Sequence, residues 1–201
     1  MDTTQHATDR WHRTIPSPVG PLTIVAGTGV IVGLYHEGHS PAPDRTQLGT
    51  LIAQGHPREP GAPAGPVVPV AAATVPPAIT VDLLGRAGRE LGEYFAGSRH
   101  TFDIPIEFRG TAFQQRVWAA LGTIPYGQTR SYRDIAARLG NPRMGRAIGA
   151  AVRSNPVSII VPGHRVIGST GAVTGYAAGT GAKTALLELE ASHRADRGCV
   201  R

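Results

Sequence analysis

Residues 159–167 read Ile-Ile-Val-Pro-Gly-His-Arg-Val-Ile, an apolar run that enters a Pro-Gly turn and a basic pair. The apolar residues from 157 to 161 predict a strand. Pro162 fixes its own φ, and Gly163 permits a tight backbone path. His164 and Arg165 then supply a titratable ring and an anion-binding group. Alone, the pattern is typical of a turn with solvated basic residues, and only its surroundings favour a functional site.

The composition is that of a globular protein with one domain or two small ones, because 41% of the 201 residues are hydrophobic and 17% are charged. No apolar run approaches the roughly 20 residues of a membrane span, and the N-terminus does not resemble a signal peptide. We therefore expect a cytoplasmic protein without membrane contact. The single cysteine, Cys199, excludes an internal disulfide, and the eight histidines lack ligand-like spacing. We expect no metal and no cofactor.

The net charge of +6 is concentrated in the second half of the chain. Residues 1–105 carry 7 Lys or Arg against 9 Asp or Glu, a net of −2, and residues 106–201 carry 13 against 5, a net of +8. Such a basic half favours a polyanionic partner, although a basic surface without any partner has the same composition. Of the 20 basic residues, 19 are arginine, which suits phosphate contacts.

The first half of the chain reads as an α/β domain with an insertion. Its patterns predict strands over 22–25 and 30–35 joined by a turn at 27–29, a helix over 81–95 and a strand over 102–106. Residues 1–12 are predicted to be a tail. From about 41 to 78 the chain is rich in Pro, Gly and Ala, with seven prolines between 55 and 78, and we interpret it as an irregular insertion.

The second half predicts mainly helices. These are a helix over 113–121, one that begins at the cap Ser131, one that begins at Asn141-Pro142, and a last helix from about Gly181. The pair over 131–152 has the lengths and the Gly-containing turn of a helix-turn-helix. Its second helix combines small residues with Arg143, Arg146 and Arg153. Two helices packed in a core is the alternative, but the charge of this half favours contact with nucleic acid.

Several motifs occur in one order and spacing between residues 108 and 191: Phe113-Gln114-Gln115-Arg116-Val117-Trp118, Ile124-Pro125-Tyr126-Gly127, Ser131-Tyr132, Arg146-Ala147-Ile148-Gly149, Pro162-Gly163-His164-Arg165 and Leu186-Leu187-Glu188-Leu189-Glu190. Together they resemble the O6-alkylguanine-DNA alkyltransferase family. The resemblance implies a ribonuclease-H-like α/β domain over 13–106, a DNA-binding domain over 107–193 with its helix-turn-helix at about 131–152, and a tail over 194–201. It also implies a DNA repair protein that binds the minor groove and flips O6-alkylguanine into a pocket.

The resemblance assigns roles to individual residues of this chain. His164, Glu190 and Asn155 match the polar network that activates the acceptor cysteine in the family, with Glu190 orienting His164. Arg146 matches the finger that fills the gap left by the flipped base, and Tyr132 acts on the neighbouring phosphate. The implied DNA-contacting residues are Tyr132, Arg146, Ala147, Gly149, Ala150 and Arg153. The implied alkylguanine pocket is formed by Tyr132, Val161, Pro162, Gly163, Val166, Tyr176 and Ala177.

The family's acceptor cysteine is replaced here by Gly163, which has no nucleophile. The favoured interpretation is a non-enzymatic lesion sensor, similar to the alkyltransferase-like proteins, which pass the lesion to nucleotide excision repair. Three alternatives stay open: an active methyltransferase whose cysteine was replaced by design, dealkylation by a water molecule that His164 and Glu190 activate, and a DNA-binding regulator without lesion preference. The expected partner is double-stranded DNA containing O6-alkylguanine, bound by a monomer in the nucleoid.

Overall fold

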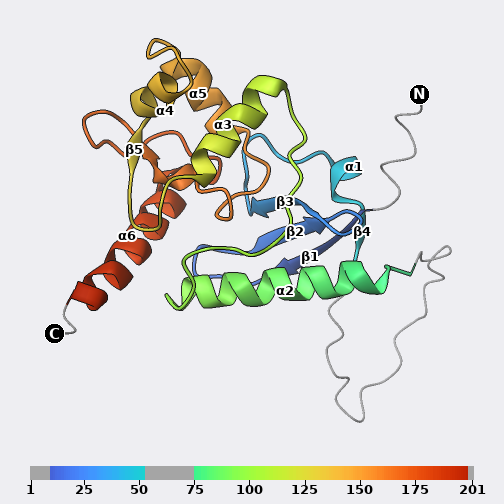
Figure 1. The fold of residues 1–201 in the computed structure, drawn as a ribbon. Helices are drawn as coiled ribbons and strands as arrows, with labels where there is room; N and C mark the ends of the chain where they lie inside the picture. The colour runs from blue at the N-terminus through green and yellow to red at the C-terminus, as the bar shows by residue number, and fades with distance from the viewer. Residues whose placement is uncertain (1–9, 53–74, 199–201) are drawn as a thin grey trace.

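The computed structural model describes residues 10–52 and 75–198, and its N-terminal part is a sheet backed by one long helix (Figure 1). The strands are β1 (Trp11–Ile15), β2 (Leu22–Ala26), β3 (Ile31–His36) and β4 (Thr50–Leu51), in the order β3-β2-β1-β4. β1, β2 and β3 are antiparallel neighbours, and β4 runs parallel to β1. The short helix α1 (Arg45–Leu48) precedes β4, and α2 (Ala78–Phe95) lies along the sheet.

Strand β3 joins the sheet to the rest of the molecule. All six of its residues are buried, although it is the outermost strand of the four-stranded sheet. Its free edge is covered by the segment that precedes the Pro-Gly turn: Leu34 N donates to Pro156 O at 2.8 Å, and Ser158 N donates to Leu34 O at 3.0 Å. The same strand contacts the linker that follows α2, because Ile31 N donates to Pro105 O at 2.8 Å. Covering an edge in this way satisfies backbone groups that a bare edge strand leaves unpaired.

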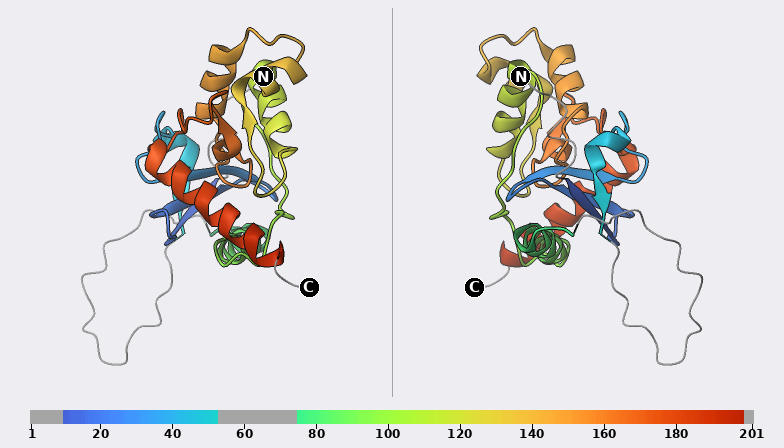
Figure 2. Two further views of the ribbon diagram at one scale, coloured as in Figure 1. Left: turned by 90° about the vertical axis from the view of Figure 1, so that its left-hand side faces the viewer. Right: turned by 90° about the vertical axis from the view of Figure 1, so that its right-hand side faces the viewer.

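The C-terminal part is mainly helical. Its elements are α3 (Ala112–Gly122), β5 (Arg130–Ser131), α4 (Tyr132–Arg138), α5 (Gly145–Arg153), the 3-10 turn η1 (Gly163–Arg165), β6 (Val166–Ile167) and α6 (Gly179–Gly198). Helices α3, α4 and α5 pack together, and Trp118 Nε1 on α3 donates to Ala151 O on α5 at 2.7 Å. β5 and β6 form a short parallel pair. Helix α6 runs from this part toward the end of α2 (Figure 2).

Several predicted elements are confirmed by the structure. The two strands and their turn form the β2–β3 hairpin, and α2 covers the predicted helix and begins three residues earlier, at Ala78. Ser131 is the N-cap of α4: its hydroxyl accepts from Asp134 N, and the Asp134 carboxylate accepts from Ser131 N. These elements depend on local periodicity and capping, which the sequence displays directly.

One predicted helix begins later than expected, and two predicted strands are wrong. Helix α5 begins at Gly145 and not at Pro142, because the Asn141 side chain accepts from Arg143 N and so closes a turn of its own before the helix. Residues 157–161 form a tight turn with isolated bridges instead of a strand. Of the predicted strand over 102–106, only Ile106 is bridged, to Ile31.

The predicted boundaries also need correction. Trp11 and His12, which were predicted to belong to the N-terminal tail, are part of β1, and α6 continues through residues 194–198 of the predicted C-terminal tail. Within the predicted insertion over 41–78, residues 44–51 contain α1 and β4, and Asp44 caps α1 by accepting from Thr46 N. The proline-rich residues 53–74, the first nine residues and Cys199 lie outside the described residues.

Two glycines give a matched test of this fold. Gly49 has a φ of 71°, and a Cβ there would lie 2.1 Å from Arg10 O, so Gly49→Ala is expected to lower the free energy of unfolding by about 1–3 kcal/mol. Gly92 lies within α2, and a Cβ there meets nothing within 4 Å. Gly92→Ala is expected to raise the free energy of unfolding by about 0.5–1 kcal/mol. Urea unfolding measures both, and a Gly49→Ala variant as stable as the wild type would contradict the close approach of Gly49 to Arg10.

Candidate functional site

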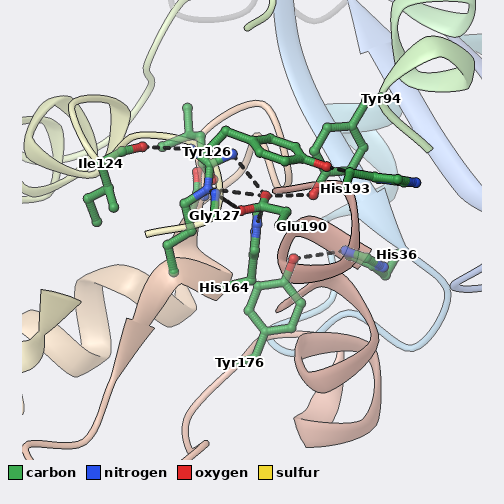
Figure 3. Close-up of polar contacts among 12 residues, drawn as sticks. His36, Tyr94, Ile124, Tyr126, Gly127, His164, Tyr176, Glu190 and His193 are labelled. Carbon is green, nitrogen blue, oxygen red and sulfur yellow. Dashed lines mark hydrogen bonds and ion pairs between the residues drawn. The ribbon is translucent and has the colours of Figure 1, made fainter. Parts of the chain in front are cut away.

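The carboxylate of Glu190 is the centre of a buried polar cluster (Figure 3). Glu190 lies on α6 and is 1% exposed. Its two oxygens accept from Tyr94 Oη at 2.8 Å, from Gly127 N at 2.8 Å, and from Arg165 Nε at 2.9 Å and Nη2 at 2.9 Å. His164 Nε2 lies 2.8 Å from Glu190 Oε1. Burial favours the neutral acid, but hydrogen bonds from His164 and Arg165 outweigh it and lower the pKa of Glu190 to about 2.

The ionised carboxylate decides which nitrogen of His164 carries the proton. Burial lowers the pKa of His164, so the ring is neutral at neutral pH and has one N–H group. Because the Glu190 carboxylate only accepts, the N–H must be at Nε2, and Nδ1 is left with a lone pair. Nδ1 is buried and has no hydrogen-bond partner among residues 10–52 and 75–198. His164 therefore holds a ready proton acceptor beside Gly163.

Asn155 holds the turn that precedes Gly163. Its Nδ2 donates to Val161 O at 2.8 Å, and its Oδ1 accepts from Val157 N at 3.1 Å. Within this turn Ile159 has a φ of 68°, a left-handed conformation that costs a β-branched residue about 1–3 kcal/mol. The strained, apolar turn explains why an unbroken strand does not form here. Asn155 thus shapes the backbone and does not itself contact His164 or Glu190 in the hydrogen bonds of the structure.

The loop over 174–177 is fixed by Lys183 and Tyr132. Lys183 is fully buried on α6, and its Nζ donates to Thr174 O at 2.6 Å and also to Val166 O. Burial lowers the pKa of Lys183 to about 8. The Tyr132 hydroxyl donates to Thr174 O at 2.9 Å, and a Cβ at Gly175 would lie 2.8 Å from that hydroxyl. Glycine at 175 therefore lets the loop approach Tyr132 closely.

A cavity of about 620 Å³ lies between this loop and α5. Its lining includes five of the six predicted DNA-contacting residues: Tyr132, Arg146, Gly149, Ala150 and Arg153. The sixth, Ala147, is exposed on the same helix. Small side chains at Gly149 and Ala150 leave room above α5, and the two arginines place positive charge at the rim.

The predicted alkylguanine pocket is only partly assembled around this cavity. Tyr132 lines it, whereas Val161 and Pro162 line a different cavity of about 480 Å³, next to Trp118 and Arg165. The four remaining members are buried: Gly163, Val166, Tyr176 and Ala177. The centre of the Tyr176 ring lies 6.4 Å from that of His164 (Figure 3). Tyr176 therefore lies beside His164, the residue after Gly163, and Val161 lines the second cavity and not the first.

Metal-binding clusters and membrane-spanning helices are both absent from residues 10–52 and 75–198. In that part of the chain, His, Cys, Asp and Glu side chains form no group of three or more that could hold a metal ion. None of the helices described there is both long and apolar enough to cross a membrane.

Comparisons with known proteins match both halves of the chain. Residues 112–192 fit the family model described as 6-O-methylguanine DNA methyltransferase, DNA binding domain. The methylated-DNA–protein-cysteine methyltransferase of Mycobacterium tuberculosis (strain H37Rv) is 43% identical over 181 residues, which cover 90% of this chain and 92% of the relative. The chain belongs to the methylated-DNA–protein-cysteine methyltransferase family. It is thus a member of a family of DNA repair alkyltransferases.

Further relatives of the methyltransferase family agree with this membership. The enzyme of the same name from Methanosarcina acetivorans is 53% identical over 106 residues, which cover 53% of this chain and 68% of the relative. The crystal structure of Mycobacterium tuberculosis OGT in complex with DNA superposes with a TM-score of 0.71 at 43% identity and covers 91% of this chain and 94% of that one. The family architecture, a sheet domain followed by a helical domain, is therefore shown over nearly the whole chain.

The structure adds three members to the polar cluster that sequence reasoning did not assign to it. Tyr94 and Gly127 bond to Glu190 but lie 96 and 63 positions away from it. Arg165 follows His164 directly and was interpreted only as a possible anion-binding group. The contact of Arg165 with Glu190 could have been predicted, because the family resemblance pairs Glu190 with His164, the residue just before Arg165. Tyr94 lies on the apolar face of its predicted helix like any core residue, so the sequence does not indicate that its hydroxyl bonds to Glu190.

The Glu190 cluster predicts a graded loss of stability. Glu190→Gln leaves the Arg165 guanidinium buried without a carboxylate, so we expect the free energy of unfolding to fall by about 3–5 kcal/mol. Tyr94→Phe removes one hydrogen bond to a charged group and is expected to cost about 1.5–3 kcal/mol. Glu93→Gln, which disrupts an exposed pair with Arg99, is the control and is expected to cost at most about 1 kcal/mol. Equal losses for Glu190 and Glu93 in urea unfolding would contradict the cluster.

The buried histidines predict a loss of stability in mild acid. Burial lowers the pKa of His36 and of His39 to about 4, below the ordinary value of 6.5. The free energy of unfolding is therefore highest above pH 6.5, where both rings are neutral in the folded and the unfolded chain. It falls by about 3 kcal/mol for each residue as the pH drops from 6.5 to 4. Glu190 adds to the loss only below about pH 4.5. Urea unfolding at pH 7.5 and 5 tests this, and a double His36→Phe, His39→Phe variant with an undiminished pH dependence would disprove it.

Proposed function

We propose that the protein is a non-enzymatic sensor of O6-alkylguanine in double-stranded DNA. The observation that carries the proposal is Gly163, which places no nucleophile next to His164 and its hydrogen bond with Glu190, at the end of the turn that Asn155 holds. Moving an alkyl group from guanine to protein requires a nucleophile such as a thiolate. A glycine has no such group, so the protein would still bind the alkylated DNA but could not accept the alkyl group.

The backbone at 163 does not itself require glycine. A Cβ placed there meets nothing nearer than Val152 Cγ1, at 3.4 Å, and Gly163 is not among the residues with a positive φ. The fold therefore tolerates a side chain at this position, and the glycine is a chemical feature more than a structural one. The acceptor cysteine can therefore be absent at position 163 without any change in the backbone that forms the binding site.

The DNA-binding part of the proposal is supported by the cavity beside α5. We propose that α4 and α5 act as a helix-turn-helix in the minor groove, with Arg146 filling the gap left by the flipped base and Tyr132 beside the phosphate. The arginine-rimmed lining and the +8 charge of the second half support it. The related Mycobacterium tuberculosis protein has been crystallised in complex with DNA. A base with damaged pairing is the least costly to flip, so the site favours a lesion.

The N-terminal domain is proposed to be ribonuclease-H-like. Its strand order β3-β2-β1-β4, with three antiparallel strands and a parallel fourth, supports this. Action as a monomer and transfer of the bound lesion to nucleotide excision repair belong to the same proposal.

A second candidate function rests on His164 Nδ1. This buried acceptor can take a proton from a water molecule whose oxygen attacks the alkyl carbon. The bond from that carbon to O6 would break, the alkyl group would leave as an alcohol, and the proton would pass to the guanine, which stays in the DNA. Water is a much poorer nucleophile than a thiolate for this carbon, so the sensor is the better supported function.

Binding and transfer are tested together on duplexes with and without one O6-methylguanine. The chain is expected to bind the lesion duplex at least about tenfold more tightly, with no gain in protein mass. Gly163→Cys is expected to gain one methyl group per molecule, and Gly163→Ala, the matched control, none. Equal affinity for the two duplexes would refute the sensor, and release of methanol beyond one equivalent per protein would establish the hydrolytic function instead.

A further inference from the structure

His36 is a buried histidine of the N-terminal sheet that contacts Tyr176, a member of the predicted alkylguanine pocket. It is the last residue of β3 and is 4% exposed. Its Nε2 lies 3.0 Å from the hydroxyl of Tyr176, and the two rings meet edge to face with their centres 5.5 Å apart (Figure 3). Sequence reasoning did not select His36, because its partner is 140 positions away.

The backbone fixes this pair from both sides. Before His36, Leu34 is bonded to Pro156 O and to Ser158 N, in the segment that leads to Gly163. After His36, Ser40 N donates to Ala177 O at 2.8 Å, next to Tyr176. The Tyr176 ring in turn lies beside the ring of His164. The backbone on both sides of His36 is therefore bonded to the segments that flank Gly163 and Tyr176, which fixes the position of His36 relative to Tyr176.

Packing alone does not explain a histidine here. The second ring nitrogen, Nδ1, is buried without a partner among the described residues, and an unsatisfied buried polar atom is costly. A phenylalanine would fill the same space without that cost. What the imidazole adds is a hydrogen bond with the Tyr176 hydroxyl, in addition to the hydrogen bond between that hydroxyl and Ser158. Burial lowers the pKa of His36 and raises that of Tyr176, so at neutral pH the bond joins two neutral groups.

We propose that Tyr176 forms a wall of the lesion site beside His164, and that His36 is a positioning residue that, together with Ser158, fixes the Tyr176 hydroxyl and ring there. The N-terminal sheet then contributes to lesion discrimination although it lies outside the DNA-contacting groove. This inference rests on the proposed lesion-binding function. Its consequence is specific: losing the bond weakens the preference for the lesion and leaves the affinity for plain duplex unchanged, since Arg146 and Arg153 line a different part of the surface.

The test compares dissociation constants for duplexes with and without one O6-methylguanine, in the full chain at pH 7.5. His36→Phe is expected to lower the lesion preference about fivefold to tenfold, the value of one hydrogen bond. His36→Gln, whose amide can again meet the Tyr176 hydroxyl, is expected to restore most of it. His39→Phe is the matched control, because His39 is equally buried but its ring contacts Tyr35 instead of the site.

A double-mutant cycle makes the result independent of stability. In a Tyr176→Phe background, which removes the hydroxyl, His36→Phe is expected to have no further effect on the preference. An unchanged preference in His36→Phe, or an equal fall in His39→Phe, would overturn the inference while the wild-type preference stands. A wild-type chain with no lesion preference would instead remove the proposed function, and the inference with it.

Discussion

The buried, ionised carboxylate of Glu190 is the interaction on which the rest of the structure depends. An ionised group inside a protein is costly unless it is paired and fully hydrogen-bonded. Its donors come from distant segments: Tyr94 on α2, the loop at Gly127, and the η1 turn through His164 and Arg165. Because each donor is needed to compensate the charge, these segments cannot move independently. The carboxylate therefore sets the relative placement of the two halves of the molecule.

This has a bearing on how the site is interpreted. The His164–Glu190 contact belongs to a structural cluster that also anchors Arg165 to Ile124 O, at 2.6 Å. Selection for a stable fold would retain it whether or not residue 163 can react. An intact histidine–carboxylate pair is consequently no sign of catalysis in this chain. Whether the protein can accept an alkyl group is decided by the residue at position 163, which the cluster does not need for its stability.

The sequence predicted correctly those elements that depend on contacts between residues close together in the chain. The capping box at Ser131 and the helix over 113–121 follow from spacing within a single turn or helix. The prediction failed at residues 157–161, where an apolar run is buried in a strained turn that Asn155 holds. It also failed at Asn141, whose side chain closes a turn and not a helix. His36 and Tyr94 were out of reach, since their roles depend on partners 140 and 96 positions away.

Lys183 has a practical consequence. It is the single lysine among the 20 basic residues, and its amine is enclosed by backbone carbonyls inside the C-terminal half. The positive surface is therefore built from guanidinium groups, which amine-directed reagents do not modify. Apart from the N-terminus, such a reagent meets no accessible target until α6 separates from the loop over 174–177. The modification rate of one side chain would then report how often this half of the molecule opens in solution.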